Sequence, residues 1–323
     1  MDNVKNVPVV NEDELFRFEP EDPNASEKII APRYSYWKSV FRVFFRKKTN
    51  VILIIFFVLI FAVSFIMPIW WQYDSMENVT NAQTYSLSPA EAMEYFGGFS
   101  FKYLLGTGSL GNSILYGIVS SARTSLLLAV ICAAINMTVG ILMGALWGYS
   151  KQLDPILLAI YNVVANVPYI LLITVLVYII GSGFGSFIFA LTVTGWLGIA
   201  YFFRTQVMVI RDREYSMASR CLGTPVTRII TKNILPFLTS VIVTLLATEL
   251  PSYISMEVFL SYIGVGLSAT VPSLGRMIQS AQTAFLSHPW EFWPPVFVAS
   301  AITIILYVLG QNLADASDPR THM

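Results

Sequence analysis

Apolar runs about as long as a lipid bilayer is thick dominate the pattern of this chain, and polar segments separate them. Because a helix rises about 1.5 Å per residue, a run of roughly 20 residues crosses the hydrocarbon layer. A large apolar core in a soluble protein is the alternative, but it does not account for uninterrupted runs of this length. We therefore expect an all-α integral membrane protein with spans at 50–71, 125–147, 155–180, 187–203, 237–261 and 292–312.

The residues before the first run divide into two parts. Residues 1–33 are acidic and show no apolar periodicity, so a flexible tail is expected there. In 34–49, aromatic and aliphatic residues gather on one side of a helix, with Lys38, Arg42 and Arg46 towards the other. This pattern favours an amphipathic helix lying in the membrane interface. An ordinary basic flank of the first span is the alternative.

Charge is scarce and unevenly distributed. Charged residues make up 12% of the chain, against about 25% in soluble domains, and the net charge of zero argues against nucleic-acid binding. Of the 20 Lys and Arg residues, all but Lys102, Arg123 and Arg276 lie on one side of the six predicted spans. By the positive-inside rule, both termini (including the tail 313–323) and the segment 204–236 are cytoplasmic.

Three segments are then expected outside the cell. The first, 72–124, contains SPAEAMEYFGG, in which Ser88 can cap a helix that Pro89 begins, with Glu91 placed for a capping box. The other two are a tight turn at 181–186 and the loop 262–291. The remaining membrane core is 125–312.

The sequence offers no constellation for covalent chemistry. Cys132 and Cys221 lie far apart, and His288 and His322 are isolated, so neither a metal site nor a nucleophile with its base is expected. The nucleotide-binding pattern G-x-x-x-x-G-K-[ST] does not occur. The chain is therefore expected to be no enzyme and to bind no cofactor itself.

A basic, helix-forming block, REYSMASRCLGTPVTRIITKNILPF, lies within the segment 204–236 and enters the next span. A first helix is expected to end at Gly223, which can adopt the left-handed conformation. Thr224 is expected to cap a second helix that Pro225 starts, and Pro236 to begin the next span. Tyr215 and Ser219 share a face with Gly223, and this largely small-residue face suits a socket in another protein. A helical loop without a partner is the alternative.

This block carries a resemblance to a known family. MASRCLG followed by NILP resembles the EAA loop of ABC-importer permeases, E-A-A-x-x-x-G, nine residues, I-x-L-P. Met217 stands at the position of the motif's Glu and Asn233 at that of its Ile, and the positions matching in register are Ala218, Ser219, Gly223, Leu235 and Pro236. REYSMASRCLG is more similar still to the R-E-Y-x-x-A-A-R-x-L-G of the oligopeptide and dipeptide branch.

The resemblance extends over about residues 100–320. It includes LLGTGSLGNSILYGIVSSARTSL, EVFLSYIGVGL, PSLGRMI and NLADASDPR. The chain departs from the family's charged positions at Gly108, Asn112, Ser113, Gln311 and Ala314, so ion pairs made there must be absent or replaced. The chain is similar to the C-type permease subunit of the binding-protein-dependent peptide importers.

The resemblance implies a type I ABC importer permease fold in a bacterial plasma membrane. It implies a second homologous permease, two P-loop ATPases that supply ATP and magnesium, and an extracellular peptide-binding protein. It also implies that the cytoplasmic block couples to an ATPase through Glu214, Tyr215, Ala218, Ser219, Leu222, Gly223, Thr224, Pro225, Leu235 and Pro236.

The fifth span holds the carboxylates Glu249 and Glu257 on either side of Pro251. Ionisable residues inside a membrane are costly and point to function. We expect Glu249, with Ser252, Ser255 and Glu257 as weaker candidates, to line the translocation pathway. Hydrogen bonding of Glu249 to a neighbouring helix, and a purely structural Glu257 that shapes the outer gate, are the alternatives.

Two further patterns in the spans favour packing. Gly140, Gly144 and Gly148 recur every fourth residue, which favours close helix contact over a ligand site. Interhelical hydrogen bonds are favoured over substrate contacts for Asn136, Asn162 and Asn166.

The functional hypothesis is a permease that passes oligopeptides by alternating access. Other substrates of the same branch, namely dipeptides, nickel chelates and glutathione, remain alternatives. An ion-driven carrier would favour inverted repeats and a relay of ionisable groups near the midplane, which the sequence does not show. A membrane-embedded enzyme would need the catalytic groups that are missing.

Overall fold

The computed structural model describes residues 35–71, 73 and 82–318, and all regular elements in these ranges are helical. Within them, five segments are long and apolar enough to span a membrane, and a bent helix pair makes a possible sixth. The spans are α3 (Lys48–Trp70), α5 (Ile114–Tyr149), α8 (Phe184–Thr192) with α9 (Trp196–Arg211), α12 (Thr239–Tyr262) with the helical turns that precede it, and α14 (Pro289–Ser317). The bent pair is α6 (Asp154–Ala165) and α7 (Tyr169–Ile180).

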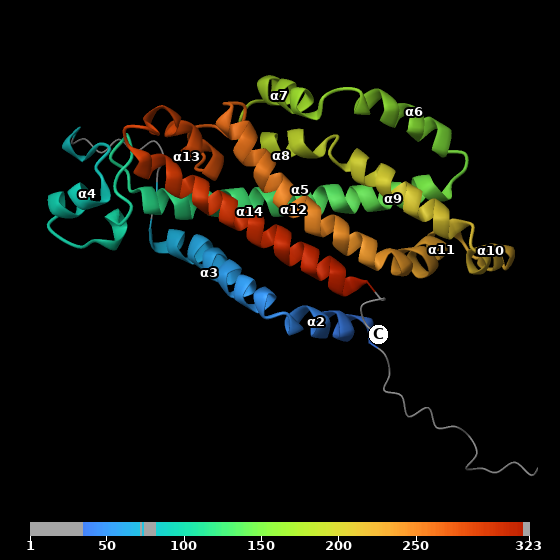
Figure 1. Ribbon diagram of the computed structural model, residues 1–323. Helices are drawn as coiled ribbons and strands as arrows, with labels where there is room; N and C mark the ends of the chain where they lie inside the picture. The colour runs from blue at the N-terminus through green and yellow to red at the C-terminus, as the bar shows by residue number, and fades with distance from the viewer. Residues whose placement is uncertain (1–34, 72, 74–81, 319–323) are drawn as a thin grey trace, which may run out of the picture. The chain divides into compact units, whose positions relative to one another are not determined.

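Helix α5 is the centre of the arrangement, with α9 and α12 packed against it (Figure 1). The glycine stripe of α5 allows α9 to approach closely. A Cβ added at Gly140 would lie 2.7 Å from the Ile199 side chain, and at Gly144 it would lie 2.6 Å from the Ala200 carbonyl oxygen. The packing interpretation of this stripe is confirmed.

The second span begins earlier than predicted, at Ile114 instead of residue 125. The Ser113 hydroxyl accepts the backbone N–H of Tyr116 and so caps the helix. The predicted span covers only the apolar run, whereas a helix can continue beyond the hydrocarbon layer and there include a charged residue. Arg123 is exposed, and its guanidinium lies 5.9 Å from the centre of the Phe65 ring.

The third predicted span, 155–180, is not one continuous helix. Helices α6 and α7 meet at an angle of 79°, with Asn166, Val167 and Pro168 between them. Proline has no N–H to donate and disfavours a helical conformation in the residue before it, which accounts for the break. The pair lies outermost, over α8 and α9 (Figure 1).

The predicted cytoplasmic block 204–236 contains less loop than expected, because helical segments extend into it from both sides. Helix α9 continues to Arg211, and Arg204 and Arg211 are 9% and 6% exposed. At the other end, α11 (Val226–Ile229), a π-helical turn (Ile230–Ile234) and a 3₁₀ turn (Leu235–Leu238) lead into α12. Pro236 therefore lies inside this continuous helical segment rather than at the start of a span.

The remaining elements are short. They are α2 (Tyr36–Arg46), α4 (Pro89–Tyr95), α10 (Glu214–Cys221), α13 (Leu274–Ser280) and the 3₁₀ turns Ala82–Thr84, Phe101–Tyr103 and Gln282–Ala284. The capping box at α4 is confirmed, since the Ser88 backbone N–H donates to the Glu91 carboxylate over 2.8 Å. Bonding to Ser88 holds the pKa of Glu91 below its usual value. The predicted tail 1–33 and residues 319–323 lie outside the described ranges.

Candidate functional site

Residues 212–225, here called the α10 loop, contain α10 and the corner that follows it. The corner is made by Gly223, whose φ is 74°. Its N–H donates to the Arg220 carbonyl, and the N–H of Thr224 donates to that of Ser219, over 3.0 and 3.1 Å. This pair of bonds is the Schellman ending of a helix. The predicted left-handed glycine is confirmed.

Two residues predicted to face a partner instead attach the α10 loop to its own chain. The Tyr215 ring stacks on Phe237 with 5.2 Å between ring centres. The Ser219 hydroxyl accepts a hydrogen bond from the Asn233 side chain over 2.9 Å. Asn233 was counted as a departure from the family motif, and so was not expected to contribute. The structure gives it the role of bracing α10 against the segment that leads into α12.

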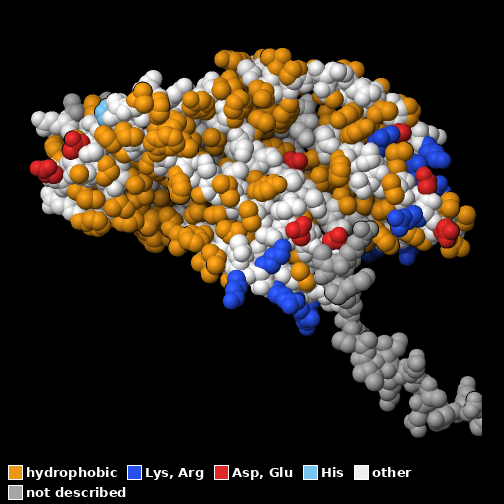
Figure 2. Space-filling model, in the orientation of Figure 1, with side chains coloured by type: hydrophobic (Ala, Val, Ile, Leu, Met, Phe, Trp, Pro, Cys, Tyr) orange, Lys and Arg blue, Asp and Glu red, His pale blue; other side chains and the backbone are white. Residues whose placement is uncertain are grey.

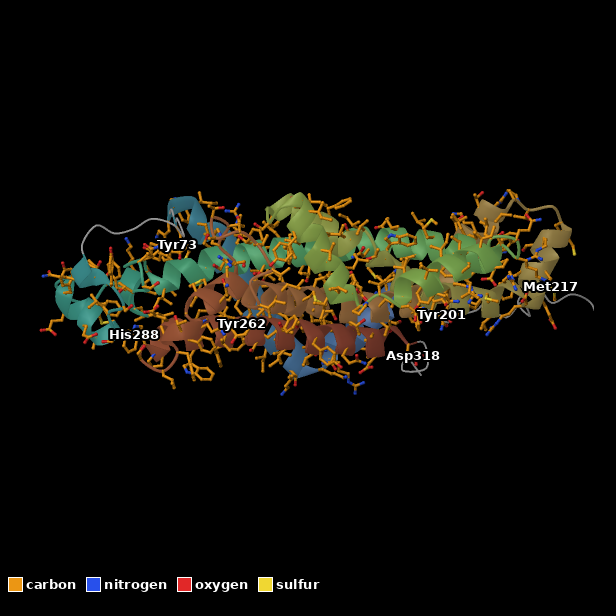
Figure 3. All side chains as sticks on the ribbon, turned by 90° about the horizontal axis from the view of Figure 1, so that it is seen from above. Tyr73, Tyr201, Met217, Tyr262, His288 and Asp318 are labelled. Carbon is orange, nitrogen blue, oxygen red and sulfur yellow. The ribbon has the colours of Figure 1, made fainter. Side chains whose placement is uncertain are left out.

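The exposed side of the α10 loop is apolar at its tip. Leu222 is 85% exposed and Met217 is 46% exposed. Figure 3 shows Met217 at the end of the helices opposite to His288. The exposed members of the predicted set are Glu214, Ala218, Leu222, Gly223, Pro225 and Pro236, whereas Tyr215, Ser219, Thr224 and Leu235 are half-buried. Met217 belongs to the exposed surface, although it stands where the family motif has a charge.

The second helix of the block begins differently from the prediction. Pro225 is the cap residue of α11 and has an extended backbone, and no side chain caps this helix. Thr224 therefore does not have the predicted capping role. Proline at this position supplies the fixed φ that turns the chain into α11.

The α10 loop is also attached to α5 and α9. The Arg211 guanidinium donates to the Gly148 carbonyl over 2.9 Å and pairs with Asp212 over 3.0 Å. This pairing lowers the pKa of the Asp212 carboxyl. Arg220 lies over the Tyr149 ring at 5.2 Å. The loop thus contacts the C-terminal ends of α5 and α9.

A cavity of about 410 Å³ lies between α12 and the α6–α7 bend. Glu249 and Ser252 line it from α12, and Tyr169 lines it from α7. Among the described residues that line the cavity, Glu249 is the charged one, and the others are mainly apolar or aromatic. A single carboxylate in such a wall is suited to a cationic group of a ligand.

Hydrogen bonds hold the tyrosines of this cavity in place. The Asn136 side chain donates to the Tyr253 hydroxyl over 2.5 Å and to the Leu191 carbonyl over 3.3 Å. The Tyr169 hydroxyl donates to the same carbonyl over 2.7 Å. Asn136 thus has the predicted interhelical role. Asn162 and Asn166, by contrast, are exposed on α6 and at its end, and Asn166 bonds to the Asn162 carbonyl.

The other two pathway candidates do not line this cavity. Ser255 lines a different hollow, of about 530 Å³, with Phe259, Tyr262 and Thr303. Glu257 is fully buried and accepts hydrogen bonds from Ser125 over 2.8 Å and from Ser261 over 2.9 Å. Of the two alternatives for Glu257, the structural one fits this position.

Replacing Glu257 with Ala is expected to destabilise the fold by about 2–3 kcal/mol, because it leaves buried hydroxyls without their acceptor. The unfolding temperature of the purified chain in detergent should fall by roughly 5 °C. Glu257→Gln keeps one acceptor oxygen and is the matched control, with a smaller fall expected. Equal unfolding temperatures for Glu257→Ala and the wild type would show that this network contributes nothing.

An ion pair that the sequence did not predict lies beside the cavity that Glu249 lines. Arg204 forks onto the carboxylate of Asp154, one of the two contacts measuring 2.8 Å, and Trp147 donates to this carboxylate over 2.8 Å. Tyr161, which lines the cavity, stacks on Tyr201 at 4.3 Å beside this pair. Fifty residues separate the two charges, so only the folded chain brings them together.

Comparisons with known proteins cover nearly the whole chain. The model of the binding-protein-dependent transport system inner membrane component family matches residues 136–323, and that of the N-terminal TM domain of oligopeptide transport permease C matches 35–89. The chain is 44% identical to the oligopeptide transport system permease protein AmiD of Streptococcus pneumoniae, over 96% of this chain and 98% of that protein.

Two relatives in Bacillus subtilis are each 32% identical to the chain. The dipeptide transport system permease protein DppC aligns over 95% of this chain and 93% of its own length. The oligopeptide transport system permease protein OppC aligns over 94% and 96%, respectively.

Proposed function

The chain belongs to the family of binding-protein-dependent transport system inner membrane components, and we propose that it is the C-type permease subunit of an ATP-driven oligopeptide importer. The observation that carries this proposal is the alignment with an oligopeptide permease over 96% of the chain. The relatives are permease subunits of transport systems, so the role of this chain is passage across a membrane rather than catalysis. Partner ATPases would bind and hydrolyse ATP with magnesium.

In this proposal, the α10 loop docks on an ATPase. Its support is an exposed apolar tip, formed by Met217 and Leu222, on a helix that is braced from behind. Because Tyr215 stacks on Phe237 just before α12, and Arg220 lies over Tyr149 at the end of α5, a displacement of α10 would move both helices. Closure of the ATPases could thus be transmitted to the spans, and hydrolysis would return them to the inward-facing state.

The cavity beside α12 is the proposed peptide pathway. A site that accepts many peptides must recognise groups that all of them share, namely the backbone amides and the two termini. The Glu249 carboxylate can pair with the amino-terminal ammonium, and the hydroxyls of Tyr169 and Tyr253 can bond to backbone groups. Ser252 contributes a further hydroxyl to the same wall.

The second permease subunit is proposed to cover the α6–α7 face. Backbone that leaves a helix is not tolerated against lipid, because its polar groups have no water to bond. The bend at Asn166–Pro168 is such a place, and the amides of Asn162 and Asn166 are exposed beside it. Contact with a second protein, around a shared wet pathway, satisfies these groups.

The peptide-binding protein is proposed to dock at the end of the helices opposite to α10. This end carries α4, α13 and His288 (Figures 1 and 3). The positive-inside rule assigns it to the outside of the cell, and it assigns both termini and the α10 loop to the cytoplasm.

The labelling of cysteine tests this orientation. Cys221 is exposed on α10, whereas Cys132 is buried in α5. A membrane-impermeant maleimide is expected to label the chain in inside-out vesicles and not in intact cells, and Cys221→Ser should abolish the signal. Cys132→Ser is the control and should leave it unchanged. Labelling in intact cells would place α10 outside and contradict the proposal.

Purification of the chain in mild detergent, followed by mass spectrometry of the proteins that accompany it, tests the assembly. A second permease and P-loop ATPases are expected. Uptake of labelled oligopeptides, dipeptides, nickel chelates and glutathione in a strain lacking this chain would then identify the substrate. Isolation of the chain alone, under conditions that preserve known importers, would contradict the importer proposal. It would favour the alternative hypothesis of an ion-driven carrier that uses Glu249.

A further inference from the structure

We propose that α2 and the first turn of α3 form a binding surface for the headgroups of anionic phospholipids. Three rows of side chains along α2 differ in character. Val40 and Phe44 are buried. A second, apolar row of Trp37, Phe41 and Phe45 is 47%, 48% and 51% exposed, and neighbouring rings lie 6.2 and 6.4 Å apart.

The third row of α2 is basic and exposed, and it consists of Lys38, Arg42 and Arg46. Each cation follows an aromatic residue by one position, so the basic row lies about 100° round the helix from the apolar row. This arrangement matches the boundary of a bilayer, where acyl chains meet charged headgroups. Figure 2 shows basic side chains gathered near α2 and the start of α3, next to a hydrophobic surface.

The connection to α3 sets the depth of α2 in the membrane. Lys47 alone separates the two helices, and Lys48 begins α3. Val51, Ile52 and Ile55 are exposed within the first two turns of α3, so the hydrocarbon layer begins there. Helix α2 therefore lies at the level of the headgroups.

Hydrogen bonds fix this corner. The Asn50 side chain donates to the Phe44 carbonyl and accepts from Asn312 of α14, each over 2.8 Å. Lys47 donates to the same Asn312 side chain over 2.8 Å. Because Asn50 is fully buried, these bonds hold α2 in one direction relative to α3 and α14. A surface held in place in this way can bind lipid without the cost of ordering it.

The basic row has no carboxylate partner among the described residues. The two ion pairs in those ranges are Arg204–Asp154 and Arg211–Asp212. Asp315 and Asp318 share a hollow with Lys47. Lys38, Arg42 and Arg46 thus remain available for phosphate, and each cation near an anionic bilayer strengthens binding about fivefold.

Native mass spectrometry of the purified full chain tests the proposal, with phosphatidylglycerol and phosphatidylcholine added in equal amounts. The wild type is expected to retain phosphatidylglycerol at least tenfold better. The variant Lys38→Gln, Arg42→Gln, Arg46→Gln should lose this preference. Lys151→Gln, Arg228→Gln, Lys232→Gln removes the same charge from other exposed positions and should keep it. Arg42→Lys, Arg46→Lys preserves the charge and should also keep it.

Three results would overturn the proposal. They are a wild type without preference, an unchanged preference in the α2 variant, and an equal loss in both charge-removal variants. The acidic segment 1–33 of the same chain is the competing occupant of the basic row. If the preference appeared only after deletion of residues 1–30, that segment and not lipid would cover α2 in the full chain.

Discussion

Replacing Gly223 with Asp is expected to abolish peptide uptake while leaving the chain inserted in the membrane. Gly223 has a φ of 74°, and a Cβ added there would meet no atom of this chain within 4 Å. Asp tolerates the left-handed region better than most residues, so the fold itself should change little. The cost arises where a charge is buried against the ATPase, at about 2 kcal/mol or more, which reduces productive docking about thirtyfold.

Three matched variants separate the possible causes. Gly223→Asn has nearly the shape of Asp and the same backbone tolerance but no charge, so it should retain most of the uptake. Gly223→Val adds backbone strain without charge. Gly185→Asp places the same charge at an exposed glycine in the first turn of α8, where a Cβ would meet no atom within 4 Å and φ is not positive, and uptake should persist.

Uptake of labelled peptide by cells, together with ATPase activity of the reconstituted importer, is the measurement. The Gly223→Asp importer should lose uptake, and any remaining ATPase activity should no longer respond to peptide-loaded binding protein. Normal uptake by this variant would contradict the docking role of the α10 loop. Loss of the chain from the membrane would instead indicate a folding defect, which the Asn and Val variants would then share.

Replacing Glu249 with Gln is expected to reduce the uptake of peptides with a free amino terminus about tenfold. The change keeps the size of the side chain and removes the charge in the cavity wall. A hydrogen bond to a charged group is worth about 1.5–3 kcal/mol, so losing the pairing with an ammonium should weaken binding by at least that factor. Peptides with an acetylated amino terminus lack this charge and should be affected much less.

Ser255→Ala is the matched control in the same helix, because Ser255 lies away from this cavity, and it should leave uptake unchanged. Ser252→Ala, in the cavity wall, should have a small effect on all peptides. Equal losses for free and acetylated peptides would refute recognition of the ammonium group by Glu249. They would still be consistent with a place for Glu249 in the pathway. An unaltered uptake of both kinds by Glu249→Gln would remove Glu249 from the pathway.

The sequence by itself determined that the protein is an all-α membrane protein and where its α10 loop lies in the chain. Uninterrupted apolar runs identify spans because lipid cannot satisfy polar side chains. A glycine with a proline two positions later, as at Gly223 and Pro225, marks the end of a short helix. These are local properties of the chain. They were sufficient to predict the left-handed Gly223, the capping box at Ser88 and the glycine stripe of α5, all of which are confirmed.

Only the tertiary structure decided which side chains face one another. A helical pattern places Tyr215 and Ser219 on one face, but it does not say that Phe237 and Asn233 will occupy that face. Likewise, Glu249 and Glu257 lie in one helix, yet one lines a cavity and the other is enclosed by serines.

The physical reason is that burial and pairing depend on neighbours that are distant in sequence. Arg204 is stable inside the protein because Asp154, fifty residues away, supplies its counter-charge. The bend between α6 and α7 was equally hidden, because hydropathy records how apolar a segment is and not whether its backbone bonds continue through Pro168. The sequence therefore identified the membrane protein and the loop that we propose as its docking loop, and the packing of helices decided which residues line the cavity.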